Sequence, residues 1–395
     1  MNRRLPDTLS MIRTLIERPS ISSTDRRFDQ SNLAVIHLLA DWFDTLGFRV
    51  KIKPVSDQKA NLIATWGDAR NHNGLVLSGH TDTVPFDDGK WSSDPFTLTE
   101  RDNRLFGLGT ADMKSFFALV LQAVQHYSSN DPAQPLIILA TADEESSMLG
   151  AKTLLQEGIR LGRYAVIGEP TQLRPVRMHK GVMMESIRII GRAGHSSDPS
   201  LGASALEGML SVLNEVIAWR EELQERYHNP LFKVAVPTLN LGAIHGGDSP
   251  NRICALCQTY FDLRPLPGMA LDELRDALTQ RLAPVLADKP GLSMEIHPLF
   301  EGLPAFETPA EAEIVRTCEQ FTGHAAQAVA FGTEAPYLSG LGMETVVLGP
   351  GSIDQAHQPD EFLALDQIQP TIDLVGELIE HYCVTEDRGR RVEGR

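Results

Sequence analysis

The chain has 395 residues, with 36 Lys and Arg against 52 Asp and Glu, and its formal net charge is −16. This length suggests two or three domains, and 42% hydrophobic with 22% charged residues is typical of a folded protein rather than a disordered, collagen-like or disulfide-scaffold chain. Nucleic acids and anionic membranes both require a positive footprint, which an acidic chain lacks. We therefore expect neither nucleic acid nor a membrane as partner, and the negative charge mildly favours a cationic or zwitterionic small-molecule ligand.

Four cysteines are too few for a disulfide framework in a chain of this length and indicate a reducing compartment. No apolar segment follows the charged N-terminus, and the longest apolar runs fall far short of the ~20 residues of a membrane span. We expect a cytoplasmic protein. The charged, aperiodic tail 386–395 is predicted to be frayed.

The first half of the sequence alternates between helix and strand patterns. The spacing of apolar residues predicts helices over 31–46, 114–127 and 147–157. Short apolar runs predict buried strands at 74–78, 135–141 and 164–168. Buried runs that alternate with helices are typical of an α/β fold with a doubly wound, mostly parallel sheet.

The pattern changes near residue 180 and returns near residue 301. Between these points we predict the order β-α-β-β-α-β, with segments at 182–190, 203–226, 234–243, 253–263, 271–287 and 292–298. This order is the ferredoxin-like split motif, whose free sheet face or edge helix suits dimerisation. Afterwards come a helix at 309–322, a strand at 345–348 and a helix at 368–383. We therefore predict one domain from 1–179 and 301–395, and an inserted domain at 180–300.

Each short strand of the first domain leads into a side chain that can bind a metal. These residues are His80, the pair Glu144 and Glu145, Glu169 and His357, and Asp112 precedes the helix at 114–127. In open α/β sheets, ligands bind at the carboxyl ends of the strands. From His80 to Glu169 the successive candidates are 24–33 residues apart, which is about one strand-helix-strand unit. We expect them to meet at one edge of the sheet.

Imidazole and carboxylate ligands together suit Zn, Co or Mn. Three carboxylates without a cation would repel one another strongly, whereas two divalent ions that share a bridging carboxylate offset the charge and activate water. Asp82 is two residues from His80 and can accept the free imidazole N–H. Glu144 and Glu145 point in opposite directions in an extended chain, so one of them would bind metal and the other would accept a proton from water.

Plainer interpretations exist for every one of these residues. The acids at 143–145 could form the first turn of a helix, and His195 taken alone is a turn residue. Cys254 and Cys257 lie in a predicted strand on opposite faces, which argues against a metal or redox pair. The coincidence of five ligand-type residues at equivalent positions favours a metal site over these interpretations.

Five motifs follow one another in the chain: 79–85 (GHTDTVP), 107–114 (GLGTADMK), 141–145 (TADEE), 168–170 (GEP) and 191–195 (GRAGH). Together they resemble the aminoacylase/acetylornithine deacetylase/succinyl-diaminopimelate desuccinylase family of dinuclear zinc hydrolases. The resemblance covers nearly the whole chain. It implies a catalytic α/β domain with an inserted dimerisation domain, and hence a homodimer.

The resemblance also implies roles for the candidate residues. Two Zn²⁺ or Co²⁺ ions would be held by Asp112 as the bridge, by His80 and Glu169 on one ion, and by Glu145 and His357 on the other. Glu144 would be the general base and Asp82 the partner of His80. His195 would reach across the dimer interface and polarise the scissile carbonyl.

Asn251, Arg264, Gly332 and Thr333 match positions that bind substrate in the family. The stretches 331–337 (FGTEAPY) and 348–361 (LGPGSIDQAHQPDE) are most similar to the acetylornithine deacetylase branch. That branch hydrolyses the acetyl amide of N2-acetyl-L-ornithine in arginine biosynthesis. We hypothesise that Glu334 binds the cationic side chain of this substrate and Arg264 its α-carboxylate. The alternatives are a succinyl-diaminopimelate desuccinylase, an aminoacylase, a dipeptidase or a non-catalytic metal-binding scaffold.

Overall fold

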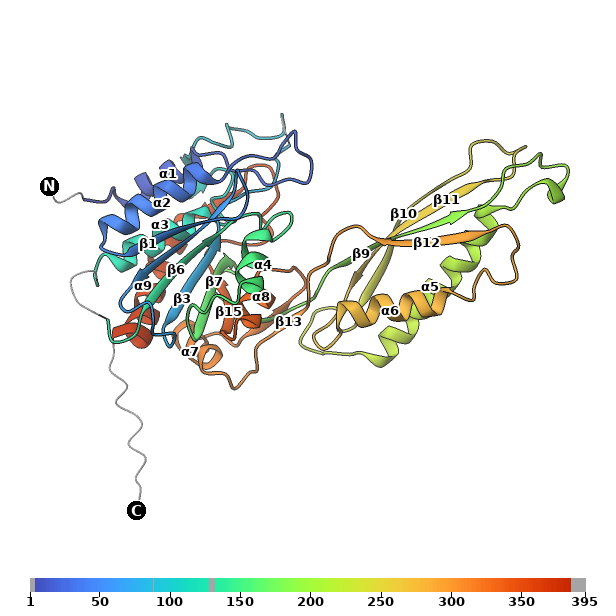
Figure 1. Cartoon of the computed structure of the whole chain (residues 1–395). Helices are drawn as coiled ribbons and strands as arrows, with labels where there is room; N and C mark the ends of the chain where they lie inside the picture. Colours follow the sequence, from blue (N-terminus) through green and yellow to red (C-terminus); the bar gives the residue numbers. More distant parts are fainter. Residues whose placement is uncertain (1–3, 88, 128–131, 385–395) are drawn as a thin grey trace, which may run out of the picture. The chain divides into compact units, whose positions relative to one another are not determined.

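The computed structural model describes residues 4–87, 89–127 and 132–384 and contains two compact units (Figure 1). Unit 1 comprises 1–177, 308–326 and 333–395, and unit 2 comprises 178–307 and 327–332. Residues 178–179, 301–307 and 327–332, which we expected in the first domain, lie in unit 2. The tail at 386–395 lies outside the described residues.

The sheet of unit 1 is parallel at its centre and antiparallel towards both edges. Its strands follow the order β1-β2-β6-β3-β7-β15, and a single residue pair then joins β15 to β8. The strands are β1 (Arg49–Pro54), β2 (Ala60–Trp66), β3 (Leu75–His80), β6 (Leu136–Thr141), β7 (Tyr164–Pro170), β8 (Val176–His179) and β15 (Glu344–Gly349). The neighbours β6, β3, β7 and β15 run parallel, whereas β2 runs antiparallel to both β1 and β6. The predicted α/β class is confirmed, and the sheet is mixed, with parallel strands at its centre.

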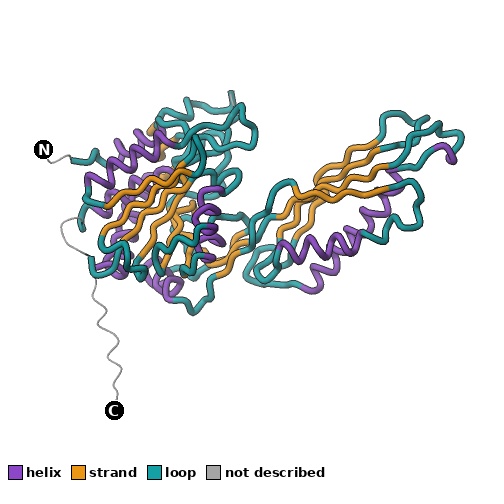
Figure 2. The backbone as a smooth tube through the Cα atoms, viewed as in Figure 1, coloured by secondary structure: helices purple, strands orange, loops and turns teal. Residues whose placement is uncertain are grey.

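Helices cover both faces of this sheet (Figures 1 and 2). They are α1 (Thr8–Ile16), α2 (Leu33–Thr45), α3 (Lys114–Val124), α4 (Leu149–Gln156), α7 (Glu313–Thr322), α8 (Ala335–Gly340) and α9 (Ile368–Ile379), which η3 (Glu380–Val384) continues. Val346 joins the core beneath α7 and α9, while its equally buried neighbour Val347 points to the other face, where α4 and α8 pack. Continuous apolar strands are needed here because successive side chains point to opposite faces and both faces are covered.

Three short strands form a separate small sheet in unit 1, in the order β16-β5-β4. They are β4 (Thr99–Arg101), β5 (Arg104–Phe106) and β16 (Phe362–Ala364), and η2 (Leu365–Gln367) follows β16. This sheet joins the segment after His357 to the segment before Asp112. Two candidate ligands that are far apart in sequence are therefore attached to neighbouring strands.

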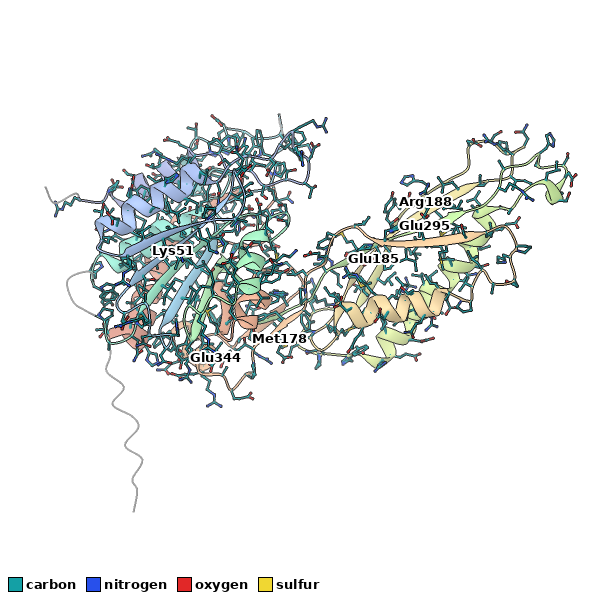
Figure 3. All side chains as sticks on the ribbon, in the orientation of Figure 1. Lys51, Met178, Glu185, Arg188, Glu295 and Glu344 are labelled. Atoms are coloured by element: carbon teal, nitrogen blue, oxygen red, sulfur yellow. The ribbon has the colours of Figure 1, made fainter. Side chains whose placement is uncertain are left out.

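Unit 2 is a four-stranded antiparallel sheet in the order β10-β11-β9-β12, with two helices on one face (Figures 1 and 2). Its elements are β9 (Met183–Ile190), η1 (Pro199–Leu201), α5 (Ala205–Arg226), β10 (Thr238–Gly246), β11 (Leu256–Arg264), α6 (Leu271–Leu282), β12 (Ser293–Pro298), β13 (Phe306–Glu307) and β14 (Gln327–Val329). Ile187 and Ile189 face the helices, whereas Arg188 pairs with Glu295 across neighbouring strands at 3.4 Å (Figure 3). The alternation predicted for a half-covered sheet produces this polar outer face.

Several boundaries differ from the sequence-based expectation. Helix α4 begins at Leu149, so the acids at 143–145 precede it instead of forming its first turn. Strand β11 begins at Leu256, so Cys254 lies before the strand and only Cys257 lies in it, and the opposite-face argument for this pair was wrong. Both thiols are nevertheless free and buried. No helix in the described part of the chain is both long and apolar enough to cross a membrane.

Candidate metal centre

The parallel strands of unit 1 bring the candidate ligands to one edge of the sheet. His80 is the last residue of β3, and it pairs in register with Thr141 at the end of β6. Glu144 and Glu145 follow in the turn after β6, and Glu169 lies near the end of β7. Because these strands share one direction, their carboxyl ends and the side chains that follow them meet at the same place.

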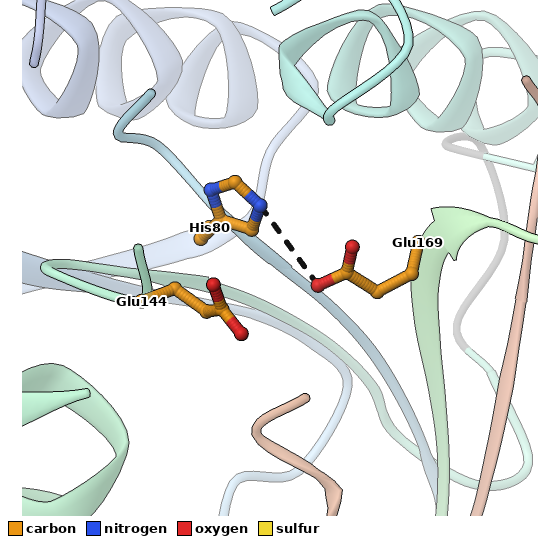
Figure 4. A group of neighbouring side chains, drawn as sticks. All are labelled: His80, Glu144 and Glu169. Atoms are coloured by element: carbon orange, nitrogen blue, oxygen red, sulfur yellow. Dashed lines mark ion pairs between the residues drawn. The ribbon is translucent and has the colours of Figure 1, made fainter. Parts of the chain in front are cut away.

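His80, Glu144 and Glu169 form a first group of possible ligands (Figure 4). One ligand atom from each lies within 4.8 Å of the others, and all three side chains are buried. His80 Nε2 lies 3.8 Å from a carboxylate oxygen of Glu169. The proposed base Glu144 therefore stands beside two proposed ligands.

Asp112 and Glu145 form a second group with the same histidine. An oxygen of Asp112 lies 2.9 Å from His80 Nε2, and its other oxygen lies 3.6 Å from His357 Nε2. His357 Nε2 is also 2.9 Å from a carboxylate oxygen of Glu145. Asp112 thus stands between the two histidines, as a bridging ligand would.

The acids of this centre are crowded and withdrawn from water. Burial, with the nearby charge of Glu169, raises the pKa of Glu144 well above its ordinary value. Burial, with Asp112, does the same to the pKa of Glu169. The hydrogen bond to Glu145 raises the pKa of His357 to about 9. Such mutual repulsion is relieved when divalent cations bind, and the mixed nitrogen and oxygen donors fit borderline ions of the zinc type.

Asp82 makes a different contact from the one we predicted. The acceptor nearest to His80 Nδ1 is the backbone carbonyl of Asp82, at 3.0 Å, and the nearer carboxylate oxygen is 3.7 Å away. The other carboxylate oxygen accepts the backbone N–H of Glu145 at 3.1 Å. The strand ends at His80, so the following residues no longer hold the extended geometry on which the prediction relied. The carbonyl can still fix the imidazole tautomer.

A buried lysine that sequence reasoning missed supports the turn of Glu144. The Lys59 ammonium lies 2.8 Å from a carboxylate oxygen of Asp143 and 2.8 Å from one of Asp29. Ser22 also donates a hydrogen bond to Asp143, at 3.0 Å. Asp143 has a positive φ of 59°, and its carbonyl accepts backbone N–H groups from the rest of the turn. This network fixes the residue immediately before the proposed base.

Glu334 precedes α8 in unit 1 and is fully buried. Neither of its carboxylate oxygens has a hydrogen-bond partner of ordinary geometry among the described residues. Burial raises its pKa to about 7, against the influence of the nearby Thr141 hydroxyl and of His80. A buried carboxylate without a partner is costly, so this position favours a cationic ligand or a neutral acid.

Unit 2 does not gather all the residues that we predicted to bind substrate. The backbone N–H of Ser196, next to His195, donates to the carbonyl of Asn251 at 3.1 Å, so these two segments lie side by side. Arg264 lies at the opposite end of β11 from Asn251, and its guanidinium donates to Asp262 at 2.8 Å. At Gly332, an added Cβ would lie 2.2 Å from a Leu303 methyl carbon, so a larger residue there would require the Leu303 side chain to move.

Residues 76–381 match the family model described as peptidase family M20/M25/M40. The chain belongs to this family. Acetylornithine deacetylase of Proteus mirabilis (strain HI4320) is 49% identical over 388 residues, which cover 98% of this chain and 99% of the relative. Acetylornithine deacetylase of Yersinia pseudotuberculosis serotype O:1b (strain IP 31758) is also 49% identical, over 97% of this chain and 99% of the relative. All the candidate ligands lie within the residues that the family model matches.

Solved structures of similar proteins share the fold. A tripeptidase from Staphylococcus aureus has a TM-score of 0.72 at 19% identity, over 95% of this chain and 97% of that one. The aminopeptidase PepT from Bacillus cereus has a TM-score of 0.73 at 20% identity, over 95% and 98%. The YXEP protein of Bacillus subtilis, described as a dinuclear metal binding peptidase, has a TM-score of 0.67 at 15% identity, over 94% and 96%. These likenesses confirm the predicted fold.

Proposed function

We propose that this protein hydrolyses the acetyl amide of N2-acetyl-L-ornithine to L-ornithine and acetate, a step of arginine biosynthesis. Relatives that are 49% identical over nearly their full length are acetylornithine deacetylases. The structural observation that carries the proposal is the convergence of two histidines and four carboxylates at one edge of the unit 1 sheet. A scaffold without catalysis would not require a buried acid such as Glu144 beside the ligands.

Two divalent ions, Zn²⁺ or Co²⁺, fit this centre. We assign Asp112 as the bridge, His80 and Glu169 to one ion, and Glu145 and His357 to the other, because these groups lie at mutual ligand distances. When bound, such ions act as Lewis acids and make water easier to deprotonate.

Glu144 acts as the general base. It takes a proton from the water that attacks the acetyl carbon, and it gives this proton to the nitrogen as the amide C–N bond breaks. His195 donates a hydrogen bond to the carbonyl oxygen as negative charge develops there, in the site of the partner subunit. The Asp82 carboxylate holds the turn of Glu145 by accepting the backbone N–H of Glu145. The products are acetate and the free amine, and no acyl-enzyme forms.

Charge complementarity assigns the substrate contacts. The unpartnered carboxylate of Glu334 binds the side-chain ammonium of the substrate. The Arg264 guanidinium binds the α-carboxylate, because its planar fork suits a carboxylate. Asn251, Gly332 and Thr333 complete the substrate-binding surface.

The protein acts as a cytoplasmic homodimer in this proposal. Leu206 and Leu210 on α5 and Ile244 on β10 are exposed apolar side chains. Strand β10 is also an edge strand of its sheet, with an outer side that no other described strand pairs. An apolar helix face next to an open strand edge suits self-association about a two-fold axis.

Release of free amine from Nα-acetyl-L-ornithine tests this function directly. We expect protein stripped with a chelator to be inactive, and turnover to return when Zn²⁺ or Co²⁺ is added back. Lack of turnover with either metal would remove this substrate from consideration. Succinyl-diaminopimelate and dipeptides would then be tested with the same preparations.

A further inference from the structure

We propose that Glu361 is a positioning residue of the metal centre. Its buried carboxylate holds the turn at 107–112 in the shape that presents Asp112 to both histidines. This inference rests on the proposed function, because it concerns the same metal centre. Glu361 is not a member of either ligand group found among the described residues, so its effect is exerted through the backbone that carries a ligand.

The carboxylate of Glu361 accepts hydrogen bonds from three backbone N–H groups of this turn. Gly109 donates at 3.1 Å to each of its two oxygens. Ala111 donates to Oε1 at 2.8 Å, and Asp112 donates to the same oxygen at 3.0 Å. Glu361 is 1% exposed, so water does not compete for these bonds. Three N–H donors around one buried carboxylate strongly fix the local backbone.

The main chain of Glu361 is bound to the same turn. Its carbonyl accepts the backbone N–H of Gly107 at 3.1 Å. The next residue, Phe362, begins β16 and pairs with Phe106 of β5, directly before the turn. The side chain and the backbone of Glu361 therefore fix the position of this residue relative to the Asp112 turn through several neighbouring contacts.

Glu361 also lies close in sequence to His357, the second histidine of the proposed centre. His357 lies four residues earlier, in the segment between β15 and β16. The carboxylate thus connects the segment that supplies His357 with the turn that supplies Asp112, and the two ligand atoms lie 3.6 Å apart. A single side chain sets the spacing of two ligands that are remote in sequence.

A carboxylate is required here rather than an amide. Glutamine offers one acceptor oxygen and one NH₂ group, and the NH₂ would face a backbone N–H where Glu361 now accepts. Aspartate keeps the charge but is one methylene shorter and cannot span the same three donors. The ammonium of Lys114 is buried nearby, donates to the Arg18 carbonyl at 3.0 Å and interacts electrostatically with Glu361.

The test is a Co²⁺ titration of the chelator-stripped protein, followed by visible absorption. For Glu361→Gln we expect roughly 10- to 100-fold weaker binding of at least one ion, as is typical when groups that orient a ligand are removed. The acetylornithine turnover that is lost at low Co²⁺ should return at high Co²⁺. A role in general stability alone would instead lower the free energy of unfolding of the metal-free variant in urea and leave the Co²⁺ affinity of the folded protein unchanged.

Asp360→Asn is the matched control. Asp360 is the adjacent acid, and it also accepts a backbone N–H, that of Ser92 at 2.8 Å, but it does not contact the Asp112 turn. The same acid-to-amide change there should leave Co²⁺ affinity unchanged. Glu361→Asp provides a second variant in case the glutamine variant does not fold, and we expect it to bind Co²⁺ more weakly as well.

The outcomes separate the two proposals. Folded Glu361→Gln or Glu361→Asp protein that binds both ions as tightly as the wild type would overturn the positioning role while leaving the proposed function intact. Wild-type protein that binds no Co²⁺, or that shows no metal-dependent turnover, would overturn the proposed function itself.

Discussion

The carboxylate of Asp82 accepts the backbone N–H of Glu145 at 3.1 Å, and this bond ties the end of β3 to the turn after β6. Asp82 is fully buried, and its other oxygen has no hydrogen-bond partner among the described residues, although it lies 3.7 Å from His80 Nδ1. Asp82 thus connects His80, a proposed ligand, with the turn that carries Glu145, a second one. Sites built on such cross-links hold their geometry before the ligand arrives.

Glu144→Gln should lower kcat by about 10²- to 10⁴-fold, the usual contribution of a general base, while the metal content stays unchanged. The reason is that glutamine cannot take the proton from water. Glu145→Gln is the matched variant and should instead lose metal. Measuring kcat together with the metal-to-protein ratio after gel filtration separates the two roles. Loss of metal from Glu144→Gln would show that Glu144 is a ligand. Its distance from His80 and Glu169 also allows that role.

Lys59→Met should destabilise the protein by about 3–5 kcal/mol, because it leaves the buried carboxylate of Asp143 without its cation. It should also reduce kcat, since Lys59 fixes Asp143 beside the proposed base. The free energy of unfolding from urea denaturation checks the first effect. Lys90→Met is the control: Lys90 pairs with Asp87 at 2.9 Å, but its side chain is 67% exposed, against 4% for Lys59. We expect the control to change stability by less than about 1 kcal/mol. Equal effects of the two variants would contradict this account.

The metal-free protein should lose stability as the pH rises from about 6.5 to about 9. The hydrogen bond to Glu145 raises the pKa of His357 to about 9, so the folded protein holds the proton more tightly than the unfolded chain. The stabilisation is complete below the unfolded value of about 6.5 and disappears as the pH passes the folded value. Its size should be only about 1 kcal/mol, because the side chain is 54% exposed and solvent screens the pair. Urea denaturation in chelator across this pH range should show a smaller slope for His357→Gln, and an unchanged slope would refute the assignment.

Glu334→Gln should raise KM much more for acetylornithine than for acetylmethionine. The first substrate carries a side-chain ammonium and the second does not, so only the first loses a charge partner. Steady-state kinetics of the metal-loaded variant on both substrates gives the comparison. The kinetics of Ser339→Ala on the same pair serve as a control for damage to α8, because Ser339 is not among the proposed substrate contacts, and they should change little for either substrate. An equal rise in KM for the two substrates would show that Glu334 does not recognise the cation.

Leu210→Asp should weaken self-association. Leu210 is 63% exposed on α5, and a charge in an apolar interface is costly to bury. Leu299→Asp is the control, because this exposed leucine follows β12 at the opposite edge of the sheet from β10. Sedimentation velocity over a range of protein concentrations should show the first variant as a monomer where wild type and control are dimers. A dimeric Leu210→Asp protein would show that the dimer interface lies elsewhere.

The sequence contains strong signals for the elements that carry the site. Short apolar runs that lead into His80 and Glu169 predict strand ends, and the parallel-sheet rule then brings them together. Helix α1 and strands β1 and β2 were not predicted, although Asp7 caps α1 and its apolar residues recur at helical spacing. Strand β2 has no comparable local signal in the sequence. Its antiparallel position between β1 and β6 depends on contacts with both neighbours.

The supporting contacts of the site were beyond a sequence-based prediction. The two partners of Lys59 are 30 and 84 residues away, and nothing in the local pattern selects them. The contact between Asp82 and His80 depends on how the chain turns after a strand ends, which spacing alone does not define. The ligand roles, and the substrate roles of residues such as Arg264, stay predictions until they are measured.

Unit 1 is built from separate segments of the chain, which has a consequence for its synthesis on the ribosome. The central strand β7 is complete at residue 170, but its neighbour β15 does not begin until residue 344. At translation rates of about 5–20 residues per second, the open edge of β7 waits on the order of ten seconds or more for its partner. During this interval a long apolar strand edge is exposed in the nascent chain, and such edges promote aggregation. The edge of β7 is therefore open to wrong pairing for a defined interval of synthesis, which ends only when the last quarter of unit 1 emerges.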